Sequence, residues 1–227
     1  KQRFAEMMGN AAKFPVMTGM ADNLQYVFNN INKYPRNPSN FGFNATRENM
    51  AKTYVDLLVA RRDPRVFAVA EPAEAKLKAG LKATDYEAYV GASSGEDLAD
   101  MSTKALNGEY SFQKRSRYYA NDTGEALFIV GYSEMCFNIA EGINRGWATG
   151  DAAEWYKRGI AASMSHYGIT DAAALATYLD GTLVKYAGNN ATGLNQILTQ
   201  KYLAFFQNSG LEAFYNQRRT GIPTFLV

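Results

Sequence analysis

The chain has 227 residues and a formal net charge of only +2, with 24 Lys and Arg against 22 Asp and Glu. This balance produces no electric field that would gather nucleic acid or an anionic membrane. Hydrophobic residues make up 47% of the chain, enough for a packed core in one large domain or two small ones. No run of about 18 apolar residues occurs, so the sequence predicts no membrane-spanning helix.

The chain contains a single cysteine, Cys136, and a single histidine, His166. An intrachain disulfide and a Cys/His zinc cluster are therefore excluded, and we expect neither a metal nor a cofactor. Cys136 stands between Met135 and Phe137 in a predicted helix, so we interpret it as a small buried hydrophobe. His166 is interpreted as a surface or boundary residue near a helix end.

Residues 1–124 are typical of a loop-rich helical region. Thr46 is a predicted N-cap for a helix that ends at 63–65, because Pro64 disfavours a helical conformation in the residue before it. The apolar positions of this helix are Met50, Tyr54, Leu57 and Leu58. A second short helix is expected over 73–81, and a loop over 91–95.

Residues 125–227 form a predicted helical-pair region that starts with a long helix. Its apolar stripe, with steps of three and four residues, consists of Phe128, Tyr132, Met135, Ile139 and Ile143. Gly131 and Gly142 lie in the same segment, where glycine costs about 1 kcal/mol relative to alanine. We therefore expect a closely packed neighbouring helix. Trp147 follows the stripe and is expected to pack inward.

Further helices follow in this region. Asp151, with Glu154 at capping-box spacing, begins the second, and Gly168 ends it. Thr170 is the predicted cap of a third, a fourth starts near Gly193, and a fifth starts at Leu211. Helices joined by tight glycine turns favour antiparallel neighbours, so the sequence predicts a mostly α protein built from helix pairs.

Two carboxylates on the long helix raise the question of catalysis. Glu134 and Glu141 are seven residues apart and share a helix face, about 10 Å apart along the axis. Paired carboxylates serve glycosidases, so this class remains an alternative. The chain otherwise lacks a recognisable nucleophile, base or metal set, and we expect no catalytic residue. Both carboxylates are expected to stabilise the helix array.

One segment outside the helices combines aromatic rings with polar donors. Sugar rings pack their C–H faces on aromatic side chains while polar neighbours bind the hydroxyls, and loops often carry such residues. The candidate ligand-binding residues are Tyr110, Phe112, Gln113, Arg117, Tyr118 and Tyr119. The alternative is that these tyrosines only pack the loop onto the helices.

A family resemblance begins at the long helix. Residues 131–141, with Ser133-Glu134 and Ala140-Glu141, resemble the "SE…AE" helix of the SusD/RagB family. Further similar motifs follow in the family's order: Arg145-Gly146-Trp147, Tyr156 with Gly159-Ile160 and Ser163-Met164, Tyr167-Gly168-Ile169, Thr199-Gln200-Lys201-Tyr202, Glu212-Ala213-Phe214, and Arg218-Arg219-Thr220-Gly221-Ile222-Pro223. Upstream, 63–65 and 89–95 favour the branch of SusD-like nutrient-binding lipoproteins.

The resemblance implies a tetratricopeptide-like array of helix pairs with a loop-rich elaboration. It also implies lipid anchoring at the surface of the bacterial outer membrane, where such a protein binds an oligosaccharide or peptide and delivers it to a SusC-like TonB-dependent barrel. Two departures stand out: His166 replaces a more usual aromatic residue, and family members are roughly twice as long. The chain therefore resembles a carboxy-terminal portion of a longer protein, and the family's lipidated cysteine is not in it.

Three functional hypotheses follow. The first is non-catalytic oligosaccharide binding in nutrient uptake, as the resemblance implies. The second is a helical-repeat scaffold that binds protein or peptide, in which case the resemblance reflects the fold alone. The third is the glycosidase. The identity of the bound sugar is not encoded in any motif that we recognise.

Overall fold

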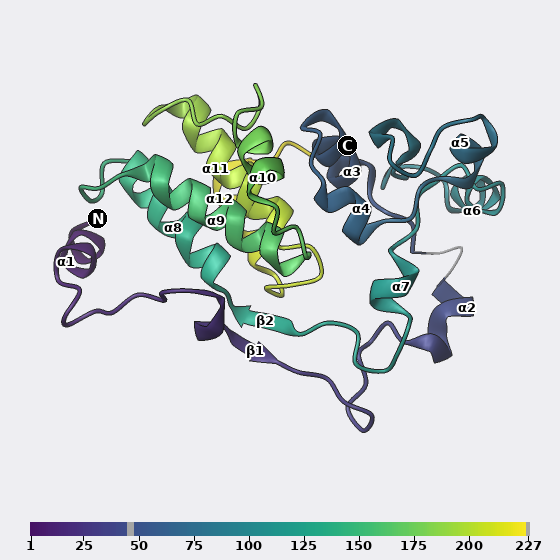
Figure 1. Cartoon of the computed structure of the whole chain (residues 1–227), viewed down its shortest axis with the longest axis horizontal. Helices are drawn as coiled ribbons and strands as arrows, with labels where there is room; N and C mark the ends of the chain where they lie inside the picture. The colour runs from purple at the N-terminus through teal and green to yellow at the C-terminus, as the bar shows by residue number, and fades with distance from the viewer. Residues whose placement is uncertain (45–47, 226–227) are drawn as a thin grey trace. The chain divides into compact units, whose positions relative to one another are not determined.

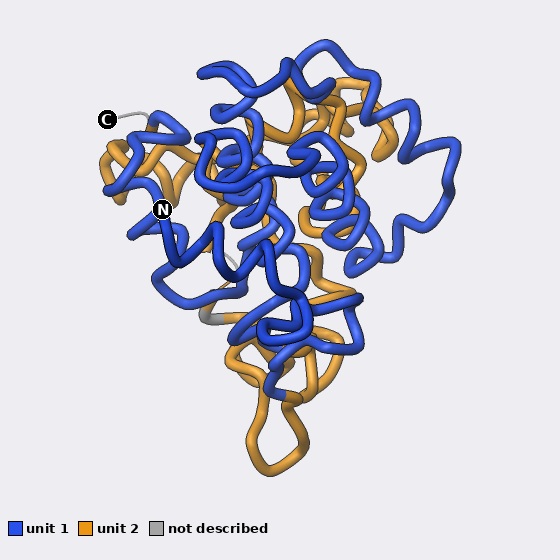
Figure 2. Tube along the Cα trace, turned by 90° about the vertical axis from the view of Figure 1, so that its left-hand side faces the viewer, with its two compact units in different colours: residues 1–26, 127–224 blue, residues 27–126, 225–227 orange. Residues whose placement is uncertain are grey.

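The computed structural model describes residues 1–44 and 48–225, and it is mostly helical, as the sequence predicts (Figure 1). The chain separates into two compact units, shown in blue and orange in Figure 2. Unit 1 contains Lys1–Tyr26 and Leu127–Thr224, and unit 2 contains Val27–Ala126 together with Phe225. The first 26 residues of the chain thus belong to the same unit as the later helices.

Unit 1 is built around three packed helices. Its elements are α1 (Gln2–Gly9), the 3₁₀ turn η1 (Met20–Asp22), β1 (Leu24–Tyr26), β2 (Leu127–Val130), α8 (Tyr132–Asn144), α9 (Ala152–His166), α10 (Ala172–Leu179), α11 (Ala191–Ala204) and α12 (Glu212–Thr220). Helices α8 and α9 lie side by side, and α11 packs against both. Their shared core includes Phe137, Tyr156, Ile160, Met164 and Ile197. From α8 this core takes Phe137 and Ala140, which the predicted stripe did not include, whereas the stripe residues Ile139 and Ile143 lie in a second buried cluster with Ala152.

Polar caps set the helix boundaries of unit 1. Asp151 accepts a hydrogen bond from the backbone N–H of Glu154 at 3.1 Å, which confirms the predicted start of α9. Helix α10 is capped by Asp171, whose carboxylate accepts from the N–H of Ala173 at 2.9 Å. The prediction of Thr170 as this cap was wrong by one residue, because an Asp side chain serves the same purpose at the next position.

Phe128 does not belong to the long helix, contrary to the sequence prediction. It lies in β2, opposite Gln25 of the antiparallel strand β1. Gly131 then has an extended backbone and acts as the N-cap, so α8 begins only at Tyr132. The apolar run before Gly131 has the spacing of a helix stripe as well as the composition of a short strand, and only the tertiary pairing decides between them.

Gly142 allows close packing of a neighbouring helix, as expected, whereas Gly131 precedes α8 and a Cβ there would meet Phe128 only at 3.6 Å. A Cβ atom on Gly142 would overlap the ring of Phe4, so α1 packs against α8 at this position. A Cβ on Gly159 would lie 2.7 Å from the Phe137 ring. Trp147 packs beside Phe4, with a 6.3 Å distance between ring centroids, but it is half-buried and only partly fulfils the expected inward packing.

Unit 2 consists of short helices linked by isolated bridges between extended segments. Its elements are η2 (Pro38–Asn40), α2 (Phe41–Asn44), α3 (Lys52–Ala60), α4 (Arg65–Val69), α5 (Glu74–Lys78), η3 (Tyr86–Ala88), α6 (Leu98–Leu106) and α7 (Arg115–Tyr118). The bridges join Asn49 to Phe112, Ala51 to Ala92, and Ala70 to Gln113. The predicted cap Thr46 lies outside the described residues, and the helix expected after it begins at Lys52.

A buried ion pair follows α3 at the predicted helix end. The guanidinium of Arg65 donates to both carboxylate oxygens of Asp63, from Nε at 2.9 Å and from Nη2 at 2.6 Å. Both side chains are fully buried. Because a bidentate pair fixes both side chains, it holds the connection between α3 and α4 in one conformation.

Candidate functional site

The predicted binding segment is divided between two environments within unit 2. Tyr118 is fully buried, and its ring stacks on that of Tyr34 with centroids 6.4 Å apart. Tyr119 is 4% exposed and lies against Phe41 and Phe112, at centroid distances of 5.3 and 5.6 Å. These rings pack the segment onto unit 2, and burial withdraws both tyrosines from solvent.

The polar members of the segment also make internal contacts. Gln113 is buried and its backbone bridges to Ala70, while its side-chain Oε1 has no hydrogen-bond partner. Arg117 donates from Nε to the carboxylate of Glu125 at 2.6 Å. The structure therefore brings Phe112 and Tyr119 together, with Tyr118 beside another ring. Tyr110 has a different environment.

Tyr110 lines a cleft of about 470 Å³ on unit 2. The lining residues are Lys52, Val90, Gly91, Ser93, Gly95, Glu96, Lys104 and Tyr110. This volume is within the range of small-ligand sites, about 300–1,000 Å³. Of the six predicted binding residues, Tyr110 is the one that lines this cleft.

Local folding places the charged groups of the cleft. Asp97 caps α6 by accepting from the N–H groups of Ala99 and Asp100, so Glu96 stands directly before the helix. Lys104 lies in the last turn of the same helix. On the other wall, Gly91 approaches the backbone of Lys52 so closely that a Cβ atom would overlap it. Glycine is therefore required where this wall closes.

The carboxylate of Glu96 binds two other residues that line the cleft. The ammonium of Lys104 donates to its Oε1, and the phenol of Tyr110 donates to its Oε2 at 2.5 Å. The hydrogen bond from Lys104, followed by that from Tyr110, lowers the pKa of the Glu96 carboxyl below its usual value. The other lysine, Lys52, donates to Asp56 at 2.8 Å.

Sequence reasoning missed Glu96 and Lys104, although the sequence contains one signal for the helix that positions them. Asp97, three residues before Asp100, has the pattern of an acidic N-cap. A helix starting there places Lys104 two turns from Glu96, and Tyr110 just beyond the helix. Their meeting at one carboxylate still requires the chain to turn back after α6.

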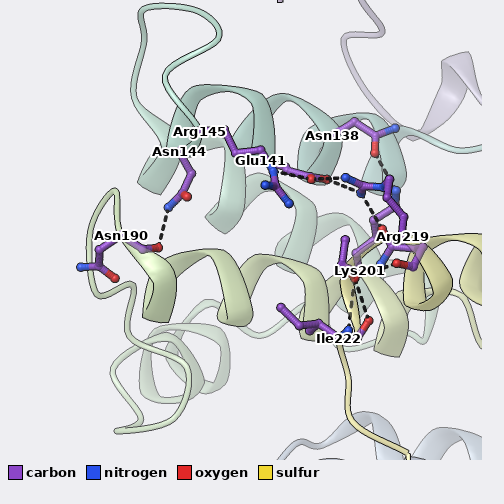
Figure 3. A network of polar contacts seen from close by, with 10 residues as sticks. Asn138, Glu141, Asn144, Arg145, Asn190, Lys201, Arg219 and Ile222 are labelled. Carbon is purple, nitrogen blue, oxygen red and sulfur yellow. Dashed lines mark hydrogen bonds and ion pairs between the residues drawn. The ribbon is translucent and has the colours of Figure 1, made fainter.

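A polar network in unit 1 contains Glu141, one of the two carboxylates considered for catalysis (Figure 3). Arg219 of α12 donates to both oxygens of Glu141, at 2.6 and 2.8 Å, and Arg145 donates at 2.8 Å. Nearby, Lys201 of α11 donates to Asn138 at 2.7 Å. Both oxygens of Glu141 are thus bound to guanidinium groups, and the ion pair between Arg219 and Glu141 connects α12 to α8.

The other carboxylate, Glu134, has a different environment. It lines a cavity of about 20 Å³ with His166, Ser163 and other residues of unit 1. Burial raises the pKa of Glu134 above its usual value. A cavity of this size holds about one water molecule and has no room for a sugar ring. His166 is half-buried against Phe128, with ring centroids 4.7 Å apart, in agreement with a boundary position.

Among residues 1–44 and 48–225, no three His, Cys, Asp or Glu side chains are grouped so that they could hold a metal ion. In the same residues, no helix has the length and apolarity needed to cross a bilayer. Cys136 is fully buried, and burial raises the pKa of its thiol to about 11.

Comparison with protein families identifies the fold. The family model described as "Starch-binding associating with outer membrane", of the SusD-like group, matches residues 1–226. The chain belongs to the SusD-like family. The motifs recognised in the sequence, from Asp63-Pro64-Arg65 to Arg218-Arg219-Thr220-Gly221, lie within this match.

Solved structures agree with the family assignment. A SusD homolog from Bacteroides fragilis NCTC 9343 is 30% identical, with a TM-score of 0.87, over 98% of this chain and 49% of its own. An outer membrane protein from Bacteroides vulgatus ATCC 8482, for which a role in nutrient binding has been suggested, is 27% identical with a TM-score of 0.81, over 98% of this chain and 54% of its own. A chitin-binding protein shares the fold at 22% identity, with a TM-score of 0.74 over 95% and 46% of the two chains.

This SusD-like chain spans about half the length of these structural relatives. The comparison with curated proteins gives no match. The family and the fold therefore rest on the family model and on the solved structures.

Proposed function

We propose that this protein binds an oligosaccharide at the outer surface of a bacterial outer membrane, leaves it chemically unchanged, and delivers it to a SusC-like TonB-dependent barrel. In this proposal a lipid anchor holds the protein to the membrane. Membership of the SusD-like family supports it, as does the family's description as starch-binding and associated with the outer membrane.

The observation that carries the proposal is the cleft of unit 2. It combines an aromatic ring, that of Tyr110, with a carboxylate and an ammonium group from Glu96 and Lys104. Such a mixture of a flat apolar surface and converging polar groups is what sugar recognition requires. The two carboxylates of α8 support a non-catalytic role, because Glu141 is bound to Arg219 and Glu134 faces a cavity of about 20 Å³.

A glycan array tests the binding step. The chain is applied to an array of plant, host and microbial glycans. Each glycan that binds is then incubated in solution with the chain and weighed by mass spectrometry. We expect binding to at least one glycan class, with the glycan mass unchanged. Blank arrays would contradict glycan binding, and shortened glycans would revive the glycosidase hypothesis.

Delivery to a transporter requires a separate experiment. The family-length protein is isolated from native outer membranes under mild detergent, and its partners are identified. We expect a TonB-dependent barrel to co-purify with it. Repeated isolation without a barrel would contradict the delivery step and leave glycan binding unaffected.

One feature of α12 supports the scaffold hypothesis as a second candidate. Leu211, Phe214 and Tyr215 are 64%, 54% and 55% exposed, whereas the polar Asn216 is buried. Exposed aromatic residues next to an arginine, here Arg218, are typical of protein interfaces. A blank glycan array together with peptide binding that is lost in Phe214→Ala would favour this candidate.

A further inference from the structure

We propose that the cleft beside Tyr110 is specific for an uncharged sugar unit, which it recognises through two adjacent hydroxyl groups bound by the paired side chains of Glu96 and Lys104. This inference rests on the proposed function, since it names the ligand class and the site for the same binding activity.

The first argument concerns hydrogen-bonding capacity. A carboxylate has about four lone-pair sites, and each oxygen of Glu96 accepts one bond here, from Lys104 or Tyr110. Acceptor sites therefore remain on Glu96. The Lys104 ammonium has three N–H donors, of which Glu96 accepts one, and the Lys104 side chain is 44% exposed. Because a sugar hydroxyl both donates and accepts, two neighbouring hydroxyls match a carboxylate and an ammonium that lie side by side.

The second argument concerns preorganisation. Glu96 is already fixed by Lys104 and Tyr110, and its side chain is only 14% exposed. A ligand therefore does not have to order this side chain on binding, which removes part of the entropic cost of association. The ring of Tyr110 lines the same cleft and provides an apolar surface for the C–H face of a sugar.

The third argument concerns charge. Both lysines that line the cleft are paired with carboxylates, Lys104 with Glu96 and Lys52 with Asp56. The hydrogen bonds to Glu96 lower its pKa, so the carboxylate is ionised at neutral pH. A uronate or sulfate group would compete with these carboxylates for the lysines and would be repelled by Glu96. An uncharged sugar meets neither obstacle.

The test compares variants on the strongest neutral glycan found by the array. Wild type, Glu96→Gln, Tyr110→Phe and the control Glu87→Gln are titrated calorimetrically, and their melting temperatures are measured. Glu87 is matched as a surface carboxylate of unit 2 that pairs with Arg62, 3.0 Å away, outside the cleft. We expect Glu96→Gln to weaken binding at least about tenfold, Tyr110→Phe less, and Glu87→Gln by no more than about twofold.

The outcomes separate the two proposals. If wild type binds neutral glycans and a folded Glu96→Gln protein binds them equally well, the cleft assignment is wrong and the proposed function stands. If wild type binds only acidic glycans, the charge argument is wrong. If it binds no glycan, the proposed function itself fails.

A gain-of-function variant keeps the charge argument testable even if Glu96→Gln fails to fold. Asp56→Asn leaves the Lys52 ammonium without its carboxylate at the cleft. With trigalacturonate as the acidic probe, we expect the ratio of acidic to neutral affinity to rise at least about fivefold over wild type. An unchanged ratio would overturn the charge selection.

Discussion

Glu134 and Glu141 lie about two turns apart on α8, yet their surroundings shift their pKa values in opposite directions. Burial raises the pKa of Glu134. Burial also acts to raise that of Glu141, but the hydrogen bonds and charges of Arg219 and Arg145 outweigh it, and the net shift is downward. The ionised form of Glu134 therefore opposes folding, whereas that of Glu141 favours it.

The first prediction concerns stability at neutral pH. Replacing Glu141 by Gln is expected to lower the free energy of unfolding by about 1–3 kcal/mol, because two guanidinium groups lose a charged acceptor. Glu134→Gln is expected to leave stability unchanged or raise it. Urea unfolding measures both. Glu154→Gln is the control, since its pair with Arg158 is about half exposed and contributes little. Equal losses in Glu134→Gln and Glu141→Gln would contradict this account.

The second prediction concerns the pH dependence. The folded-state pKa of Glu141 lies below the unfolded value, so its contribution is complete above the unfolded pKa, about 4.3, and is lost as the pH falls through the folded pKa. The stability advantage of wild type over Glu141→Gln should therefore shrink from pH 7 to pH 3. For Glu134 the folded pKa is raised, so the cost of its charge should grow as the pH rises above the unfolded pKa. Urea unfolding of both variants at several pH values checks these trends. If the two substitutions changed stability with pH in the same direction, the opposite pKa shifts of Glu134 and Glu141 would be refuted.

The third prediction is that Gly142→Ala lowers stability in the wild-type chain and raises it when the Phe4 ring is absent. Alanine is the better helix former by about 1 kcal/mol, but its Cβ would overlap the ring of Phe4. Gly142→Ala alone should therefore displace α1, with a change in the fluorescence of Trp147, which contacts Phe4. In a Phe4→Ala background the same substitution should stabilise the protein by about 0.5–1 kcal/mol. A stability change of the same sign in both backgrounds would contradict the packing of Phe4 against Gly142.

The fourth prediction separates packing from binding in the segment 110–119. Tyr118 is fully buried, so Tyr118→Ala should cost about 3–5 kcal/mol of unfolding free energy. Tyr110→Phe removes one hydrogen bond at a partly exposed ring and should cost about 1 kcal/mol or less. Thermal unfolding gives both values. A Tyr118→Ala protein of wild-type stability with lost glycan binding would move the site to the buried rings.

The helices of unit 1 were largely predictable because their signals are local. Asp151 and Glu154 show the start of α9 in four residues, and Ile139 and Ile143 of the predicted stripe are buried in α8. Phe128 was misassigned because the same spacing fits a helix and a short strand, and only pairing with Gln25 makes it a strand. Thr170 and Asp171 are adjacent caps of similar strength, which leaves the boundary open by one residue.

The candidate site was less predictable because its contacts are distant in sequence. Tyr118 and Tyr119 look like binding residues in a polar loop, yet Tyr34 and Phe41, far upstream, cover their rings. The proposed site instead includes Glu96, to which α6 and the following turn bring Lys104 and Tyr110 back. Side-chain composition makes the segment a candidate, and long-range packing decides which of its residues face solvent.

Saturation-transfer NMR on a neutral oligosaccharide that binds in the array tests the central claim most directly. To detect binding, protein protons are irradiated and the transfer of saturation to the sugar is measured. To detect hydrolysis, the spectrum of the sugar is followed over several days in the presence of the chain. The account predicts saturation transfer to the C–H protons of the sugar, weakened strongly in Glu96→Gln, and no new reducing-end signals. Absence of transfer, or the appearance of reducing ends, would contradict a protein that binds an oligosaccharide and leaves it unchanged.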